Sequence, residues 1–332
     1  MKTIIKTLPA LLLLAALSGC GKDSFDKPDY YTLKASTEFG QGIVDASEGY
    51  ITHVKTSQET EIMDGVSLLE LGYLNGKSHA MQAYIYKVEL GAAMVKVSVP
   101  DDDTKIEKVQ KLTLQANAIE NSGKYLVMGG ISGGSFNAET GAPSGILYHN
   151  SKAYSSNFGK DAAFFAVMKD GAAVCLDASE FEAKKSKVTE AVSGSAMILK
   201  DGYVLTETDA STTAKAAVGV NEDGTAIYLV VVDGGDYFYS NGIANSDMAT
   251  LLKGCGASDA MILSSGKNVS AFTRDENSVV LANLVALTLK WLCSKSAMTL
   301  LWVQQRQTVL LCMAVLMHRM VHLKQSLMFR VH

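Results

Sequence analysis

The alternation of apolar and polar residues is most informative between residues 215 and 267. Two apolar runs, residues 216–220 and 226–232, flank a polar segment that contains Asp223-Gly224. An Asp-Gly pair between two such runs is typical of a β-hairpin. The second run is apolar at every position, so it predicts a strand that is covered on both faces.

A helix is predicted soon after this hairpin. Between Met248 and Cys255 the apolar residues recur at helical spacing, Ser246 is placed to cap the start, and Gly254 and Gly256 are placed to end the helix. The helix therefore links the buried strand to whatever follows it.

The next apolar run, residues 259–263, predicts a further strand. Strand, helix and strand in this order predict a right-handed crossover between neighbouring strands. Asp233 and Ser264 should then lie at the same carboxyl-terminal edge, where open sheets of this kind bind ligands.

The rest of the chain adds half-buried strands and hairpins. Apolar residues alternate with polar ones in residues 50–54, 79–90 and 94–99, and Asp170-Gly171 and Asp201-Gly202 mark two further hairpins. A helix is predicted within residues 106–119. The fold class is therefore α+β: mixed, mostly antiparallel sheets with hairpins, plus a strand-helix-strand crossover that carries the cleft.

The first residues are a targeting segment. Lys2 and Lys6 precede an apolar run at residues 8–17, and Leu17-Ser18-Gly19-Cys20 follows. This arrangement resembles a bacterial lipoprotein signal peptide, which implies cleavage of residues 1–19, a lipid on Cys20, and a membrane anchor in the cell envelope. The alternative is an ordinary secretory signal in which Cys20 is incidental. The polar residues 20–45 suit a tether.

The composition limits the kinds of partner and ligand that the protein is expected to bind. The net charge is −4 and 19% of the residues are charged, a balance that does not favour nucleic acid. Cys175 and Cys255 are interpreted as buried small hydrophobes in preference to a disulfide. His53 and His79 lie in predicted strands and are interpreted as structural or surface residues. The run 101–103 lacks the spacing of a calcium loop, so no metal site and no particular cofactor is predicted.

Residues 277–332 differ from the rest of the chain. They contain six Lys or Arg residues and no Asp or Glu. We interpret this change as an altered reading frame or a misassembled terminus, and we expect the folded domain to comprise residues 46–276. A basic segment on the membrane surface is the alternative.

Several short glycine-containing segments, taken in order, identify a family. They are Gly133-Gly134-Ser135-Phe136, Gly141-Ala142-Pro143-Ser144-Gly145, Ala191-Val192-Ser193-Gly194, Lys215-Ala216-Ala217-Val218-Gly219, Val231-Val232-Asp233-Gly234, Ser240-Asn241-Gly242 and Ile262-Leu263-Ser264-Ser265-Gly266. This order resembles the phosphodiester glycosidase domain family, well over residues 110–276 and loosely over residues 45–110. The resemblance implies an envelope lipoprotein that hydrolyses the glycosyl-phosphate bond of a sugar phosphodiester.

The resemblance also implies a site. Asp233 and position 264 are implied as the catalytic pair, and the implied substrate-binding residues are Gly133, Gly134, Lys215, Ser240 and Gly266.

This chain departs from the family pattern at four of the positions concerned. The family usually has Asn at position 132, Arg at positions 215 and 235, and Asp at position 264, where this chain has Ser132, Lys215, Gly235 and Ser264. Lysine keeps a positive charge but not the two-pronged grip of arginine on phosphate.

Cleavage of a glycosidic bond ordinarily uses two carboxyl groups. Ser264 can donate a hydrogen bond but supplies no negative charge, which predicts a loss of roughly 10³-fold or more in rate. Two functions stay open: an active hydrolase of a sugar phosphodiester, and a catalytically degenerate lipoprotein that binds a glycan or phosphoglycan.

Overall fold

The computed structural model describes residues 32–102, 106, 108–134, 136–137, 139–156, 163–205, 210–274, 279–281, 295–296 and 299–305. The predicted signal peptide, Cys20 and the first part of the predicted tether lie outside these residues. The end of that tether is corrected, because residues 38–45 form a helix, Glu38–Asp45, whose Ile43 and Val44 are buried in the core. The described residues from Leu33 onward belong to one compact unit. Among the described helices, none is long and apolar enough to cross a membrane.

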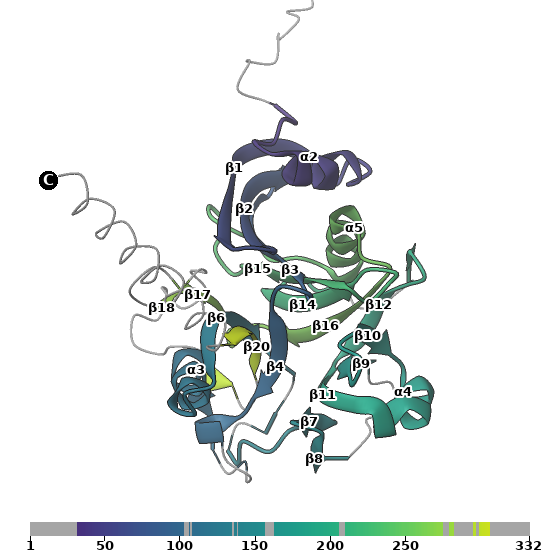
Figure 1. Cartoon of the computed structure of the whole chain (residues 1–332). Coiled ribbons are helices and arrows are strands. Elements are labelled where there is room, and N and C mark those ends of the chain that lie inside the picture. The colour runs from purple at the N-terminus through teal and green to yellow at the C-terminus, as the bar shows by residue number, and fades with distance from the viewer. Residues whose placement is uncertain are drawn as a thin grey trace, which may run out of the picture. The chain divides into compact units, whose positions relative to one another are not determined.

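The centre of the fold is an eight-stranded sheet, here called the main sheet (Figure 1). Its strands, in spatial order, are β1 (Ile51–Met63), β2 (Val66–Asn75), β3 (Ala80–Glu89), β15 (Ala226–Val232), β14 (Lys215–Val220), β16 (Asp259–Ser265), β12 (Ala196–Lys200) and β13 (Tyr203–Val204).

In the described part of the chain, two five-stranded sheets and a two-stranded sheet complete the β structure. The β9 sheet has the order β10 (Ala173–Leu176), β9 (Ala163–Met168), β11 (Val188–Gly194), β7 (Leu147–His149) and β8 (Lys152–Ser155). The β6 sheet has the order β18 (Val279–Leu281), β17 (Ala271–Arg274), β6 (Tyr125–Ser132), β20 (Thr299–Gln305) and β4 (Met94–Ser98). The small sheet pairs β19 (Lys295–Ser296) with β5 (Gln110–Lys111).

The described helices are short. They are α2 (Glu38–Asp45), α3 (Leu112–Asn121), α4 (Ala178–Lys184) and α5 (Asn245–Cys255), with the 3₁₀ turns η1 (Pro100–Asp102) and η2 (Lys185–Lys187). The mixture of these helices with antiparallel sheets confirms the predicted α+β class.

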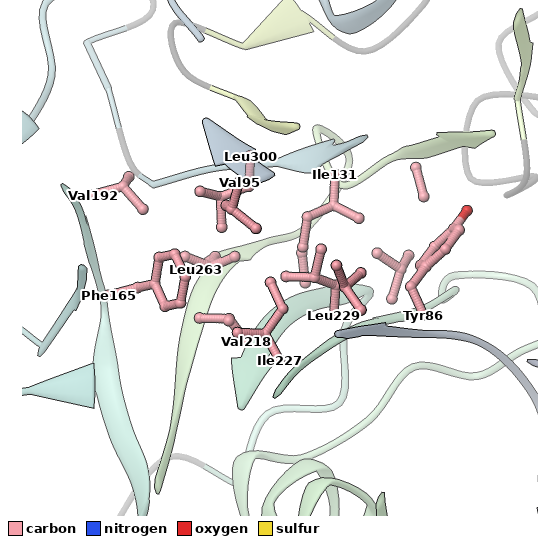
Figure 2. Close-up of a cluster of buried hydrophobic side chains, with 14 of the residues drawn as sticks. Tyr86, Val95, Ile131, Phe165, Val192, Val218, Ile227, Leu229, Leu263 and Leu300 are labelled. Atoms are coloured by element: carbon pink, nitrogen blue, oxygen red, sulfur yellow. The ribbon is translucent and has the colours of Figure 1, made fainter. Parts of the chain in front are cut away.

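The main sheet is covered on both faces. One face packs on the β9 and β6 sheets around the cluster shown in Figure 2, here called the inner core. The other face packs on α2 and α5, here called the helix side. Along β15, Leu229 and Val231 belong to the inner core, whereas Val230 and Val232 belong to the helix side. This alternation confirms the prediction of a strand covered on both faces.

The three Asp-Gly hairpins are confirmed. Asp170-Gly171 joins β9 to β10, Asp201-Gly202 joins β12 to β13, and Asp223-Gly224 lies between β14 and β15. Each of these glycines has a positive φ, the backbone region that glycine adopts without steric cost.

The predicted helices are confirmed with changed bounds. α5 ends at Gly256, which has a φ of 100° and caps the helix, but its N-cap is Ala244 and not Ser246. α3 begins only at Leu112, because residues 110–111 pair as β5. Cys175 and Cys255 are buried and free, as predicted.

The crossover differs from the prediction in one respect. β15 and β16 are not neighbours, because β14 lies between them and pairs antiparallel with both. The hairpin explains this arrangement: β14 already occupies the edge of β15 when the chain crosses over through α5. β15 and β16 therefore run parallel, one strand apart.

The end of the folded domain also differs from the sequence-based boundary at residue 276. Residues 299–305 form β20, which lies between β6 and β4 in the middle of the β6 sheet. Leu300, Leu301 and Val303 are fully buried. Part of the segment with the unusual composition therefore belongs to the core.

A buried polar network joins the β6 and β9 sheets. The carboxylate of Glu190 on β11 accepts hydrogen bonds from Lys96 Nζ (3.0 Å) and the backbone N–H of Val97 (3.1 Å), and its Oε2 lies 3.1 Å from His149 Nδ1. The other ring nitrogen, His149 Nε2, lies 2.9 Å from Asp102 Oδ1. Burial lowers the pKa of His149, but the hydrogen bonds and charges of Asp102 and Glu190 outweigh it and raise the pKa to about 9.

This raised pKa predicts a pH-dependent stability. The folded state binds the His149 proton more tightly than the unfolded state, whose pKa is about 6.5. The stabilisation is therefore complete below about pH 6.5, and it is lost as the pH rises through about 9. Urea unfolding at pH 6 and pH 10 measures the free energy of unfolding at each pH. From pH 6 to pH 10, the wild type should lose on the order of 3 kcal/mol more of this free energy than His149→Gln does. Equal losses in the two proteins would contradict the assignment.

Candidate functional site

The predicted site residues converge at one edge of the main sheet. Lys215, the first residue of β14, pairs with Val232 of β15 on one side and with Ser265 of β16 on the other. Asp233 and Ser264 therefore lie at the same edge, two strand spacings or about 10 Å apart in the direction across the sheet. This placement agrees with the sequence-based expectation, although a strand separates the two residues.

These residues do not all lie on the same face of the main sheet. Ala216, an inner-core residue, pairs with Ser264, and a register shift between Ala216 and Ala217 interrupts the alternation along β16, so that Ser264 lies on the inner-core face as Leu263 does. Lys215 pairs with Val232 of the helix side, and its side chain is almost completely buried. By strand alternation Lys215 therefore lies on the face opposite Ser264. Asp233 is 2% exposed, and its backbone N–H extends the β15–β3 pairing by donating to the carbonyl of Gln82 (3.1 Å).

Two of the departures from the family pattern are in direct contact. The hydroxyls of Ser132, at the end of β6, and Ser264 lie 3.1 Å apart. Ser132 Oγ also accepts a hydrogen bond from the backbone N–H of Ser270 (3.3 Å). Where the family has an amide and a carboxylate, this chain has two neutral hydroxyls that bond to each other. The two serines thus bond to each other and carry no charge.

Gly133 and Gly134 follow Ser132 and are both buried. A Cβ at position 134 would lie 2.1 Å from the carbonyl oxygen of Ser193 on β11. No side chain fits in that space, so Gly134 allows the backbones of the two segments to pack directly. Whether either glycine also holds substrate stays a prediction.

Ser240 holds the loop that begins at Asp233. Its hydroxyl donates to the carbonyl oxygen of Asp233 (2.6 Å) and accepts from the backbone N–H of Gln82 (3.1 Å). Its backbone N–H also donates to the carbonyl of Asp236 (2.8 Å). The Ser240 side chain is fully buried, and these contacts fix the position of Asp233. Its predicted contact with substrate is not tested by these bonds.

Gly266 lies at the end of β16. Its backbone N–H donates to the carbonyl of Ala214 (2.8 Å), and its φ is 82°. A Cβ at this position would meet no atom within 4 Å, so the surface beside Gly266 is open. Gly266 and Ser264, at the end of β16, therefore lie at the same edge of the main sheet as Asp233.

A pair of tyrosines lies beside Asp233. The hydroxyls of Tyr84 on β3 and Tyr239 in the loop are 2.8 Å apart. Burial raises the pKa of both phenols, and the carboxylates of Asp233 and Glu70 raise each of them further. Sequence reasoning missed Tyr84, Tyr239 and Glu70. The signal for Glu70 is a single acid within the otherwise apolar run of β2.

Two exposed aromatic rings lie in the same loop. Tyr237 is 68% and Phe238 87% exposed, and their ring centroids are 5.4 Å apart in an edge-to-face arrangement. The ring of His79 lies 6.2 Å from that of Tyr237. Exposed neighbouring aromatic rings of this kind are typical of binding surfaces.

A cavity of about 420 Å³ lies away from this edge. Its lining residues are Thr37, Glu59, Glu61, Gly65, Val66, Ser67, Lys87 and Glu89. None of the predicted site residues lines it, and Lys87 pairs with Glu89. Within the described parts of the chain, no group of three or more His, Cys, Asp or Glu residues is placed to hold a metal ion.

Comparisons with known proteins confirm the family resemblance. Residues 125–283 match the model of the phosphodiester glycosidase family. A search of curated proteins finds no match to the chain.

Solved structures show the same fold at low sequence identity. The catalytic domain of zebrafish N-acetylglucosamine-1-phosphodiester alpha-N-acetylglucosaminidase, auto-inhibited by its pro-peptide, is 17% identical with a TM-score of 0.53, over 74% of this chain and 86% of that one. A Synechocystis protein is 10% identical with a TM-score of 0.55, over 74% and 63% of the two chains. A Burkholderia pseudomallei protein is 10% identical with a TM-score of 0.53, over 68% and 74%.

Proposed function

Because residues 125–283 of this chain form a phosphodiester glycosidase domain, we propose that the protein hydrolyses the glycosyl-phosphate bond of a sugar phosphodiester, slowly, with Asp233 as the acid-base group. The observation that carries the proposal is the position of Asp233. It directly follows β15 at the edge where β16 also ends, and the Ser240 hydroxyl donates a hydrogen bond to its carbonyl oxygen.

The chemistry assigns different tasks to the two strand ends. A carboxylate at Asp233 can take a proton from an attacking water or return one to the leaving oxygen. Ser264 can hydrogen-bond a sugar or phosphate oxygen but cannot stabilise the positive charge that develops on the sugar ring. The low rate follows from this missing charge. Lys215 lies on the opposite face of the sheet and is almost completely buried, so no contact with the phosphate group is proposed for it.

The contact between Ser132 and Ser264 favours a second function. The two hydroxyls bond to each other and form an uncharged polar surface, which suits binding. In this second function a glycan or phosphoglycan occupies the site without being cleaved. In that case the chain is a binding lipoprotein and not an enzyme.

The release of phosphomonoester from an aryl glycosyl phosphodiester, followed by phosphorus NMR, separates the two functions. We expect slow turnover by the wild type and a loss of roughly 10²-fold or more in Asp233→Asn. Asp223→Asn is the matched control, because Asp223 is exposed in the turn before β15. Equal rates in wild type and Asp233→Asn would contradict the assignment of Asp233, and binding without turnover would favour the second function.

The exposed rings of Tyr237 and Phe238 suit the face of a sugar. We expect Phe238→Ala to raise KM about fivefold or more with little change in kcat, because stacking on a bound sugar contributes on the order of 1 kcal/mol. Steady-state kinetics measure the split. A fall in kcat at constant KM would contradict a role in binding.

We also propose that the protein is anchored in a bacterial envelope through a lipid on Cys20. The support is the apolar run at residues 8–17 followed by Leu17-Ser18-Gly19-Cys20. We expect Cys20→Ala to move the protein from the membrane fraction to the soluble fraction of cells. Unchanged retention in the membrane fraction would overturn the proposal.

A further inference from the structure

Glu70 is an acid in the middle of an apolar strand. Its neighbours along β2 alternate between the two cores: Val66 and Leu68 belong to the inner core, and Leu69 and Leu71 belong to the helix side. The same alternation places Glu70 on the inner-core face, where it is half-buried. A carboxylate among apolar side chains loses part of its hydration, which costs free energy of folding. Its presence here therefore suggests a function.

The strand pairing places Glu70 in one row with the candidate site. Glu70 pairs with Tyr84 on β3, and Tyr84 pairs with Val231 on β15. Val231 pairs with Ala216 on β14, which pairs with Ser264 on β16. Side chains in such a row share a face of the sheet, so Glu70, Tyr84 and Ser264 all lie on the inner-core face.

Asp233 joins this row diagonally. It follows Val231 by two residues, and residues two apart along a strand point to the same face. Asp233 is thus the diagonal neighbour of Tyr84, a separation that long and aromatic side chains can span. Glu70 and Asp233 lie on either side of Tyr84, whose hydroxyl bonds to that of Tyr239.

The electrostatics agree with this arrangement. The negative charges of Asp233 and Glu70 both raise the pKa of Tyr84 and of Tyr239, so both carboxylates are close to the same pair of hydroxyls. Burial raises the pKa of Glu70 itself, which favours its protonated form. A carboxyl group that donates a proton beside one that accepts a proton is the pairing that general acid-base catalysis needs.

We propose that Glu70 is the second carboxyl group of the site and acts as the proton donor in the hydrolysis, a role that rests on the proposed function and on Asp233 as its partner. The Tyr84–Tyr239 hydroxyl pair lies close enough to both acids to feel their charges. Glu70 thus gives the site a second carboxyl group, from a strand far away in the sequence, but not the charge that is missing at position 264.

The proposed step balances as follows. The Asp233 carboxylate takes a proton from a water molecule, and the water oxygen bonds to the anomeric carbon of the sugar. The bond between that carbon and the phosphate oxygen breaks, and its electron pair stays on the oxygen. Glu70 donates its proton to this oxygen, so the products are a free sugar and a phosphomonoester. Exchange with solvent then returns both carboxyl groups to their starting states.

The test compares Glu70→Gln with Glu70→Asp in the full chain. We expect Glu70→Gln to lower kcat/KM roughly 10²-fold or more and to abolish the fall of kcat/KM at high pH, because glutamine has no proton to lose. Glu70→Asp should keep that fall and part of the rate. Glu61→Gln, an exposed acid on the neighbouring β1, is the matched control and should match the wild type.

A third variant adds Glu70→Gln to the change Ser264→Asp. A carboxylate at position 264 would supply charge, whereas Glu70 supplies a proton from a distant strand of the sheet, so the two changes should act independently and Glu70→Gln should again cost roughly 10²-fold or more. Turnover that depends on Asp233 but is unaffected by Glu70→Gln would overturn the role of Glu70 and leave the proposed function standing. A wild type without any turnover would overturn both.

Discussion

A chain that ends at residue 276 is expected to be unable to fold. The cut removes β20, the strand between β6 and β4, and with it the side chains of Leu300, Leu301 and Val303, which are fully buried. Burial of each contributes about 1.5–3 kcal/mol, so their sum is comparable with the total stability of a typical domain, about 5–15 kcal/mol. The cut also removes β18 and β19, so β4, β5, β6 and β17 each lose a paired edge.

Circular dichroism and thermal unfolding of the shortened chain test this expectation. In the full chain, Leu301→Ala is a smaller change in the same strand, and it should lower the free energy of unfolding by about 2–5 kcal/mol. The composition of residues 277–332 alone predicts the opposite result, a shortened chain that melts at the same temperature as the full one. An unchanged melting temperature would mean that β20 is not part of the fold.

The double change Ser264→Asp, Ser265→Gly is expected to raise kcat/KM at least about 10²-fold. It places a carboxylate on the same face as Asp233, and the hydroxyl of Ser132, 3.1 Å from Ser264 Oγ, can donate a hydrogen bond to it. The added charge stabilises the positive sugar ring of the transition state, which a serine cannot do.

Two controls isolate the charge. Ser265→Gly alone changes an exposed residue and should leave the rate unchanged. Ser264→Asn introduces a side chain of the size of aspartate without its charge and should also give no gain. A double variant no faster than the wild type, with an unchanged melting temperature, would mean that position 264 does not face the substrate.

Local signals in the sequence predicted the local structure correctly. The Asp-Gly pairs located the hairpins, and the unbroken apolar run of residues 226–232 identified a strand covered on both faces, because turn geometry and burial act on neighbouring residues. The edge that joins Asp233 and Ser264 followed from the same reasoning, since a strand-helix-strand crossover fixes where strands end.

Pairing between distant segments was beyond these signals. Nothing in residues 259–265 indicates that β16 pairs with β14, and nothing near Glu70 indicates that it shares a row with Ser264. The place of β20 in the β6 sheet is set by partners more than 150 residues away, such as Lys96, which pairs with Leu301. Composition could not reveal it, because a strand is recognised by what it packs against.

The most direct test of the central claim is the fate of the oxygen atom during hydrolysis in oxygen-18 water. A glycosidase breaks the bond between the sugar carbon and the phosphate oxygen, so the solvent oxygen bonds to the sugar. We expect the label in the anomeric hydroxyl of the released sugar, none in the phosphomonoester, and the labelled product to depend on Asp233. Label in the phosphomonoester, or no labelled product at all, would contradict the assignment of this site as that of a phosphodiester glycosidase.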